Sequence, residues 1–166
     1  MQDVKVEKVF GKDFYPALDQ SNAHIYEGLN YRHWDEWEDG AYSHLFVQAA
    51  NDSAGTKGKD IMQGQAFDCP KKPFGGEEDY TWTPDSKFVV YVTKRETGTD
   101  YAVSTNTDIF AYEVATGRTT NLTEGMMGYD THPQYSKQGT LAWLSMKRGG
   151  YESDKNDILV QSAGVL

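Results

Sequence analysis

The hydrophobic positions of this chain form short runs separated by turn residues, and no segment shows convincing helical spacing. The clearest run, residues 88–93 (Phe-Val-Val-Tyr-Val-Thr), follows the turn sequence Pro84-Asp85-Ser86. Aromatic and β-branched side chains favour the pleated surface of a β-sheet, whereas Pro, Asp and Ser favour tight turns. The pattern therefore predicts short strands joined by tight turns.

These runs recur along the chain. Residues 135–148 repeat residues 82–95 at a constant offset of 53, with aromatic on aromatic, hydroxyl on hydroxyl and Lys-Arg on Lys-Arg. Residues 157–159 (Asp-Ile-Leu) repeat residues 108–110 (Asp-Ile-Phe) at an offset of 49. The intervening loop is therefore shorter in the later copy. Self-similarity at a period of about 50 residues is typical of repeat architectures.

A more diverged copy precedes these two. Residues 29–32 resemble the strand end at residues 92–95, and residues 44–47 (His-Leu-Phe-Val) take the place of residues 108–111. Matched sub-elements in three copies indicate three related structural units.

The middle copy predicts a complete unit. Strand one ends near Trp82, strand two covers residues 88–93, strand three about 107–114, and strand four 119–123 after a turn at 115–118. Four antiparallel strands in about 50 residues are typical of a β-propeller blade.

We therefore predict an all-β protein in which residues 1–166 form one partial propeller domain of about three four-stranded antiparallel blades. Because propellers close with about four to eight blades, three units leave the ring open. We expect the chain to be a piece of a longer protein. The approximate units are residues 22–70, 71–123 and 124–166.

Composition narrows the range of partners. The net charge of −9 argues against a nucleic-acid partner, because phosphate binding needs a concentrated basic surface. No run of 18 apolar residues exists, so we expect no membrane span. The lone cysteine, Cys69, excludes an internal disulfide, and we expect neither a metal site nor a cofactor.

Several strings resemble a known family. Residues 82–87, 108–110 and 117–123 resemble the WD-like propeller repeats of TolB and of prolyl-oligopeptidase-type serine peptidases. Three further strings resemble the N-terminal propeller of the dipeptidyl peptidase V and acylaminoacyl peptidase branch, and the resemblance extends over roughly residues 4–161. Those strings are residues 31–37, 104–109 and 150–156.

This resemblance implies a two-domain serine exopeptidase, periplasmic or secreted, that acts on peptide substrates. In such enzymes the propeller shapes or gates a chamber, and a C-terminal α/β-hydrolase domain carries the Ser-Asp-His triad. That triad needs a Gly-x-Ser-x-Gly nucleophile elbow, and the chain contains none. We therefore expect no catalytic residue here and interpret the chain as a non-catalytic propeller segment.

The candidate substrate-binding residues lie in the loops that join strands two and three. An acidic residue beside Tyr151, either Glu152 or Asp154, could hold the free amino terminus of a peptide, and Trp34 and Trp37 could line a side-chain pocket. A solvated loop, with the tryptophans as core or interface anchors, is the competing interpretation.

Two other functions stay open at this point. A TolB-like propeller could serve protein interaction without peptidase activity. Alternatively, an autonomous small protein could complete a ring by oligomerising, because three units alone leave two uncovered faces.

Overall fold

The computed structural model describes residues 31–161 except 34, 38–39 and 54, and it divides the chain into two compact units. The first unit comprises residues 1–41 and 97–102. Its described part contains the hairpin of β1 (Arg32–His33) and β2 (Glu36–Trp37), together with most of helix α2 (Gly98–Val103). The blade unit predicted over residues 22–70 lies partly outside the described residues.

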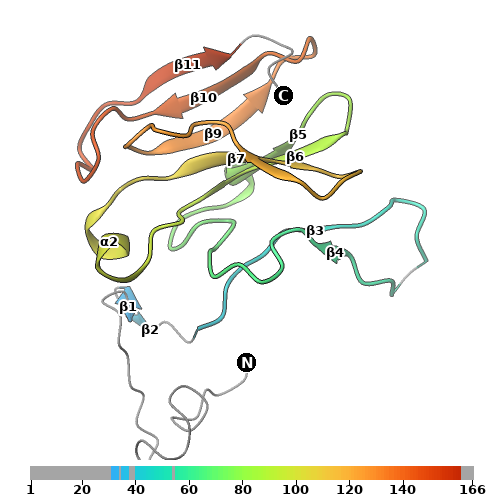
Figure 1. Ribbon diagram of the computed structural model, residues 1–166, viewed down its shortest axis with the longest axis horizontal. Coiled ribbons are helices and arrows are strands. Elements are labelled where there is room, and N and C mark those ends of the chain that lie inside the picture. The colour runs from blue at the N-terminus through green and yellow to red at the C-terminus, as the bar shows by residue number, and fades with distance from the viewer. Residues whose placement is uncertain (1–30, 34, 38–39, 54, 162–166) are drawn as a thin grey trace, which may run out of the picture. The chain divides into compact units, whose positions relative to one another are not determined.

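The second unit, residues 42–96 and 103–166, is built of antiparallel sheets (Figure 1). A two-stranded sheet pairs β3 with β4, a four-stranded sheet has the order β5-β6-β7-β8, and a three-stranded sheet has the order β9-β10-β11. A short 3-10 helix, η2 (Glu77–Asp79), precedes the four-stranded sheet. The strands are β3 (Phe46–Val47), β4 (Lys59–Asp60), β5 (Tyr80–Trp82), β6 (Phe88–Thr93), β7 (Asp108–Glu113), β8 (Thr119–Asn121), β9 (Asp130–Tyr135), β10 (Leu141–Ser145) and β11 (Asp157–Gln161).

The middle sheet, β5–β8, matches the predicted unit strand for strand. Its second strand begins and ends where the apolar run does, and its third and fourth strands are joined by a tight turn in which Gly117 has a φ of +77°. Glycine suits that left-handed conformation because it has no Cβ. The mostly β content that the pattern predicts is confirmed, although the chain as described forms no closed propeller ring.

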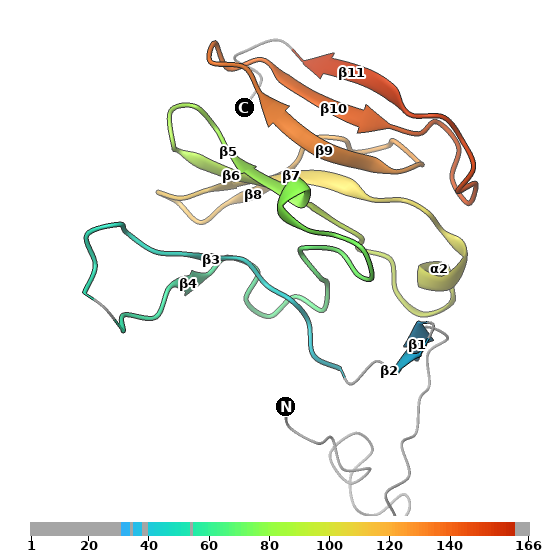
Figure 2. The ribbon, with the colours of Figure 1, turned by 180° about the vertical axis from the view of Figure 1, so that it is seen from behind.

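The three sheets follow one another through the second unit, with the middle sheet between the other two (Figures 1 and 2). One face of the middle sheet packs on residues that follow β4, and the other packs on β10. The first core contains Ile61, Met62, Cys69, Val89, Tyr91, Phe110 and Tyr112, and the second contains Val90, Val92, Ile109, Ala111, Leu141 and Trp143.

The two-stranded sheet corresponds to the third and fourth strands of the middle sheet. Phe46 pairs with Asp60 as Phe110 pairs with Asn121. Beyond these pairs, the Ile61 amide donates to the Leu45 carbonyl, and the Leu122 amide donates to the Ile109 carbonyl. The placement of residues 44–47 on residues 108–111 is therefore confirmed.

The constant offset of 53 is wrong for the second strand of the last sheet. The turn after Ser136 is one residue shorter than the turn after Thr83, because Ser136 N–H donates to the carbonyl of Thr140 whereas Thr83 N–H donates to that of Phe88. Trp143 consequently corresponds to Tyr91, and Ser145 corresponds to Thr93. Packing agrees, since Tyr91 and Trp143 each point at the preceding sheet of the series.

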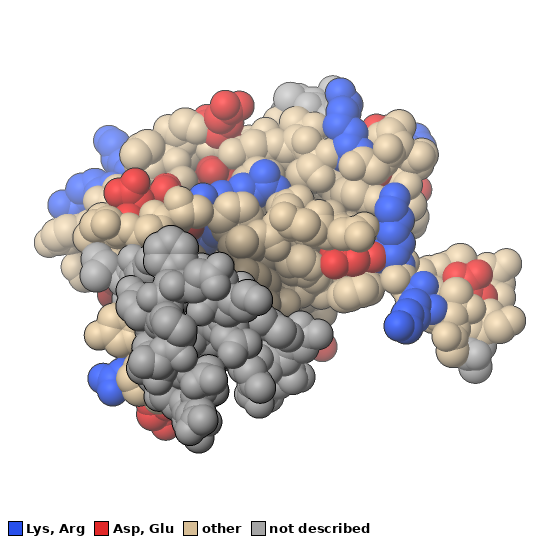
Figure 3. Space-filling model, turned by 60° about the horizontal axis from the view of Figure 1, so that its bottom comes forward, with Lys and Arg blue, Asp and Glu red and all other residues tan. Residues whose placement is uncertain are grey.

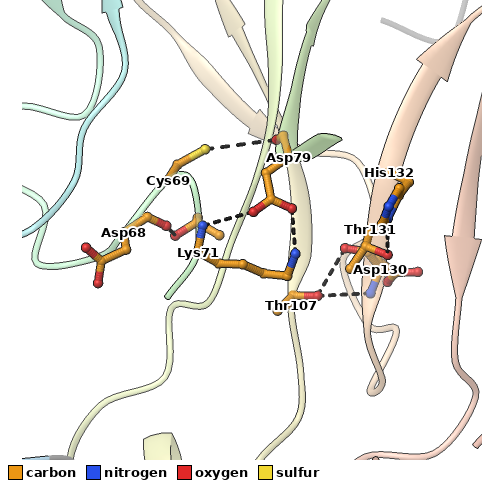
Figure 4. Close-up of polar contacts among 9 residues, drawn as sticks. Asp68, Cys69, Lys71, Asp79, Thr107, Asp130, Thr131 and His132 are labelled. Atoms are coloured by element: carbon orange, nitrogen blue, oxygen red, sulfur yellow. Dashed lines mark hydrogen bonds and ion pairs between the residues drawn. The ribbon is translucent and has the colours of Figure 1, made fainter. Parts of the chain in front are cut away.

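Buried polar contacts tie the sheets together where β5 and β9 begin (Figure 4). The fully buried Asp79 accepts hydrogen bonds from the Lys71 ammonium at 2.5 Å and from the Lys71 amide at 2.9 Å. The Thr107 hydroxyl donates to the Asp130 carbonyl and accepts from the Asp130 amide, both at 3.0 Å. Cys69 is buried beside them, and burial raises the pKa of its thiol.

Helix α2 lies in a segment that the hydrophobic pattern assigns to a loop. Its six residues, Gly-Thr-Asp-Tyr-Ala-Val, make fewer than two turns and contain no buried side chain, so they carry no amphipathic period. Among the described residues, no helix is long and apolar enough to cross a membrane.

Candidate functional site

The loop between β10 and β11 carries three of the five candidate residues, and the backbone holds it closely against the segment before β7. The Gly150 amide donates to the buried Thr105 hydroxyl at 2.9 Å. Gly150 has a φ of +70°, and a Cβ on Gly149 would lie 2.6 Å from the Met127 carbonyl oxygen. Glycine at both positions permits this approach, so the loop starts from a fixed point.

Within the loop, Arg148 engages two of the candidates. Its Nε and NH2 groups donate to the two carboxylate oxygens of Asp154 at 3.2 and 3.1 Å, in a bidentate pair. The guanidinium carbon lies 3.9 Å from the centroid of the Tyr151 ring. Hydrogen bonding from Arg148 lowers the pKa of Asp154. Asp154 is therefore ionised but already neutralised by a cation of the same chain.

Glu152 is in a different position. It is exposed and has no hydrogen bond or ion pair with a described residue. Its charge is felt by two neighbours. Burial raises the pKa of Tyr129 and Glu152 adds to that shift, while burial lowers the pKa of Lys94 against the opposing charges of Glu96 and Glu152. Of the two acidic candidates, Glu152 is thus the one with an uncommitted carboxylate.

Lys94 supplies a cation beside this carboxylate. It is half-buried at the end of β6, and its ammonium donates to the Ser104 carbonyl at 2.5 Å. The charge of Glu152 therefore acts on Lys94 from the middle sheet and on Tyr129 from the segment before β9, although among the described residues no hydrogen bond or ion pair joins Glu152 to either. A ligand ammonium near Glu152 would share that carboxylate with Lys94.

The tryptophan candidates lie in the first unit. Trp34 is outside the described residues. Trp37 is 60% exposed, stacks on Tyr31 with ring centroids 6.1 Å apart, and has the Arg32 guanidinium carbon 5.7 Å from its ring centroid. These contacts fit an aromatic anchor within its own hairpin.

Sequence reasoning missed Arg148, Lys94 and Tyr129 as members of this site. The Lys-Arg pairs at residues 94–95 and 147–148 were a signal, because they mark the strand ends from which the loops depart. From the sequence alone these pairs indicate only the repeat.

Outside this loop we examined the charge distribution and possible metal ligands. On the described part of the face in Figure 3, basic and acidic residues are interspersed rather than gathered. Among the described residues, no three His, Cys, Asp or Glu side chains are arranged to hold a metal ion.

Comparison with known proteins gives consistent relatives. The chain is 47% identical over 150 residues to dipeptidyl-peptidase 5 of Porphyromonas gingivalis, covering 90% of this chain and 22% of the relative. It is 48% identical over 144 residues to dipeptidyl-peptidase 5 of Porphyromonas endodontalis, covering 86% and 21%. The protein of the same name from Schizosaccharomyces pombe is 30% identical over 150 residues, covering 84% and 21%.

No protein-family model and no solved structure matches the chain. The chain spans about one fifth of the length of the curated relatives that it matches. Bacterial and fungal relatives share one name and align over nearly the whole chain. The chain is therefore related to one segment of the dipeptidyl-peptidase 5 proteins.

Proposed function

We propose that this chain is a non-catalytic run of β-propeller blades in a dipeptidyl peptidase and forms part of the wall of its substrate chamber. The repeated stacking of sheets is the observation that supports a propeller. The middle sheet, through Tyr91, and the last sheet, through Trp143, each turn an aromatic-bearing face onto the preceding sheet of the series. Sheets that stack in one direction are the building principle of a propeller.

The last sheet supports a continuing series. Ile158 and Val160 are 73% and 64% exposed, whereas the corresponding Ile109 and Ala111 of the middle sheet are 0% and 1% exposed. Exposed apolar side chains on a sheet face favour coverage by a further element. We take the face of β10 and β11 as the surface on which the next blade packs.

The peptidase part of the proposal draws on the names of the relatives and on what the sequence lacks. A serine peptidase of this type needs a nucleophile elbow, and no Gly-x-Ser-x-Gly string occurs in the chain. We propose that an α/β-hydrolase domain elsewhere in the longer protein performs hydrolysis, and that the longer protein is periplasmic or secreted. This chain would bind, orient or admit the peptide.

Within the chain, Glu152 is the proposed contact for the free amino terminus of the peptide. A dipeptidyl peptidase must recognise that ammonium group, and an exposed carboxylate can accept a charge-assisted hydrogen bond from it. Asp154 is less suited, because its two oxygens already accept from Arg148. Tyr151 would flank the peptide with the ring face that Arg148 does not cover.

The test uses the full-length protein that contains this chain. Glu152→Gln should raise KM for dipeptidyl substrates with a free amino terminus by roughly 10- to 100-fold, the worth of one charge-assisted hydrogen bond, and should change kcat less. Glu113→Gln, which lies at the opposite end of the middle sheet, is the matched control and should leave KM unchanged.

Three results would count against the proposal. An unchanged KM in Glu152→Gln would remove Glu152 from the site. A full-length protein that releases no dipeptides would favour the binding-module alternative, and measurable turnover by the 166-residue chain alone would contradict its non-catalytic role.

A further inference from the structure

Two described residues other than glycine have a left-handed backbone, Ser86 with a φ of +58° and His132 with a φ of +56°. Side chains make this conformation strained, because the Cβ crowds the backbone. Ser86 is explained by its turn, in which its N–H donates to the Thr83 carbonyl at 2.8 Å. The equivalent turn of the last sheet has Gly139 at this position, with a φ of +85°. His132 has no such explanation, because it lies inside strand β9.

Strand β9 contains one extra residue at this point. Between the paired residues Leu144 and Ala142, β10 contains a single residue, whereas the facing stretch of β9 contains two, His132 and Pro133. The corresponding strand β5 pairs with β6 in unbroken register. In one common kind of β-bulge the first extra residue is a left-handed glycine, and a residue before proline is restricted further. Glycine would therefore hold this backbone with less strain than histidine does.

The His132 side chain is exposed, whereas its neighbours Thr131 and Pro133 are buried. Its Nδ1 lies 3.1 Å from the Thr131 hydroxyl, which orients the ring (Figure 4). Among the described residues, none hydrogen-bonds to its Nε2. A strained residue that presents an oriented polar group to solvent is typical of functional sites, and bulges often serve to redirect such a side chain.

Strand β9 starts beside the residue on which the Glu152 charge acts. Tyr129 directly precedes the strand, and burial raises its pKa with an added contribution from Glu152. Strand residues advance by about 3.3 Å each, so His132 lies at most about 10 Å further along the chain than Tyr129. An extended peptide advances at the same rate. A peptide that started near Glu152 and followed β9 would therefore meet His132 with one of its next few residues.

The neighbouring first strand adds aromatic surface. Strand β9 packs against β5, and each is the outermost strand of its own sheet. On β5, Tyr80 and Trp82 are 37% and 46% exposed, and on β9 His132 and Gln134 are exposed. Aromatic rings combined with a few hydrogen-bonding side chains are the usual composition of a peptide or ligand site. The exposed side chains of these two strands therefore suit a peptide.

We propose that His132 is a peptide contact whose Nε2 hydrogen-bonds a backbone amide group of the bound peptide, beyond the amino terminus assigned to Glu152. This inference rests on the proposed function. A backbone amide group offers both a donor and an acceptor, so it can pair with Nε2 whichever way the ring hydrogen is placed. The strain at His132 is then tolerated for a contact that glycine could not make.

Thermal unfolding of the 166-residue chain tests the strain. His132→Gly and His132→Ala both remove the ring, but only glycine relieves the left-handed backbone. The Tm of His132→Gly should therefore exceed that of His132→Ala by about 2–6 °C. Ser86→Gly and Ser86→Ala form the matched pair and should show the same order. Equal Tm values for the two His132 variants would overturn the proposal, because no strain would need a functional reason.

Peptide binding by the full-length protein that contains this chain tests the contact. The probe is penta-alanine with a free amino terminus, followed by kcat/KM where it is cleaved and by calorimetric Kd where it is not. His132→Gly should weaken either quantity by about 3- to 10-fold, the worth of one neutral hydrogen bond. His132→Gln, whose amide can replace Nε2, should recover most of the loss, and Ser86→Gly should behave as wild type. Wild-type binding by His132→Gly would overturn the contact.

The proposed function and the His132 contact fail separately. A loss in Glu152→Gln together with wild-type binding in His132→Gly would contradict the His132 contact alone. A full-length protein that binds penta-alanine without releasing dipeptides would contradict the peptidase role, while a weaker Kd in His132→Gly would still support the contact. A protein that neither binds nor cleaves the peptide would contradict both.

Discussion

The middle sheet and the last sheet are two copies of one unit in different surroundings. Ile109 and Ile158 occupy equivalent positions, yet Ile109 is fully buried and Ile158 is 73% exposed. The middle sheet has a neighbour on each face, and the last sheet has one described neighbour. Burial in this protein is therefore decided less by residue type than by whether a unit has a sheet on both sides.

The two sheets also begin differently. Both have a fully buried carboxyl group at or next to the first strand, Asp79 before β5 and Asp130 at the start of β9. Asp79 is paired with the Lys71 ammonium, whereas Asp130 Oδ1 accepts from the Trp143 indole at 2.9 Å and its Oδ2 has no partner among the described residues. The Asp79 carboxylate is stabilised by its ion pair with Lys71, whereas burial disfavours the ionised form of Asp130.

The largest expected effect is the loss of the paired carboxyl. Asp79→Asn leaves the partly shielded Lys71 ammonium without its buried anion, and breaking a pair with a buried member costs up to about 3–5 kcal/mol of the free energy of unfolding. Urea denaturation of the 166-residue chain measures it. Asp85→Asn, at an exposed turn, is the control. A loss below about 1 kcal/mol would mean that Asp79 and Lys71 contribute little.

The matched isoleucines give the next largest effect. Ile109→Ala should lower the free energy of unfolding by about 2–5 kcal/mol, because it removes a fully buried side chain and leaves a cavity. Ile158→Ala should change it by less than about 0.5 kcal/mol. Both variants are compared by urea denaturation in the same chain. Equal losses would show that the face of the last sheet is covered in solution, for example by a second copy.

How well the sequence predicts the strands of these sheets differs from one strand to the next. The strands of the middle sheet follow directly from one apolar run and its turns. The pairing of residues 44–47 also followed, because Leu-Phe-Val matches Ile-Phe-Ala. The shift in β10 did not, since one missing turn residue changes which face Trp143 occupies while Lys-Arg still aligns with Lys-Arg. Only packing separates the two alignments.

The candidate site, like the sheets, could be predicted from the sequence only in part. Its loop and its acidic residues could be read from the sequence, but the difference between Asp154 and Glu152 depends on where Arg148 points. A side-chain direction in an irregular loop has no periodic signal. The burial of Lys94, which lowers its pKa, likewise arises from residues that are distant in sequence.

A smaller effect is expected at the indole that meets Asp130. Trp143→Phe removes the indole N–H that donates to Asp130 Oδ1 and should cost about 1–3 kcal/mol, the penalty of a lost hydrogen bond to a buried polar group with some loss of packing. The equivalent change, Tyr91→Phe, removes a hydroxyl that accepts from the Arg95 guanidinium at 3.3 Å, and should cost about 1 kcal/mol or less. Thermal unfolding of both variants gives the ratio, and a costlier Tyr91→Phe would reverse this ranking.

The smallest expected effect is at Asp130, and it concerns how steeply the free energy of unfolding changes with pH. Burial raises the pKa of this carboxyl, and the nearby Asp108 charge acts in the same direction. A folded-state pKa above the unfolded value means that stability from this group is present at low pH and is lost as pH rises from about 4 through the raised pKa. Asp130→Asn can still accept from Trp143, so it should keep or slightly increase the free energy of unfolding at pH 7 and flatten that decline.

Asp85, whose pKa is lowered first by the Thr83 hydroxyl, has the opposite sign: its contribution to stability is present above about pH 4 and is lost as pH falls. Denaturation of Asp130→Asn and Asp85→Asn from about pH 2 to 7 separates the two signs, because the Asp85 contribution is lost below about pH 4 and the Asp130 contribution above it. A loss above about 1 kcal/mol in Asp130→Asn at pH 7 would show that the ionised carboxylate stabilises the last sheet after all.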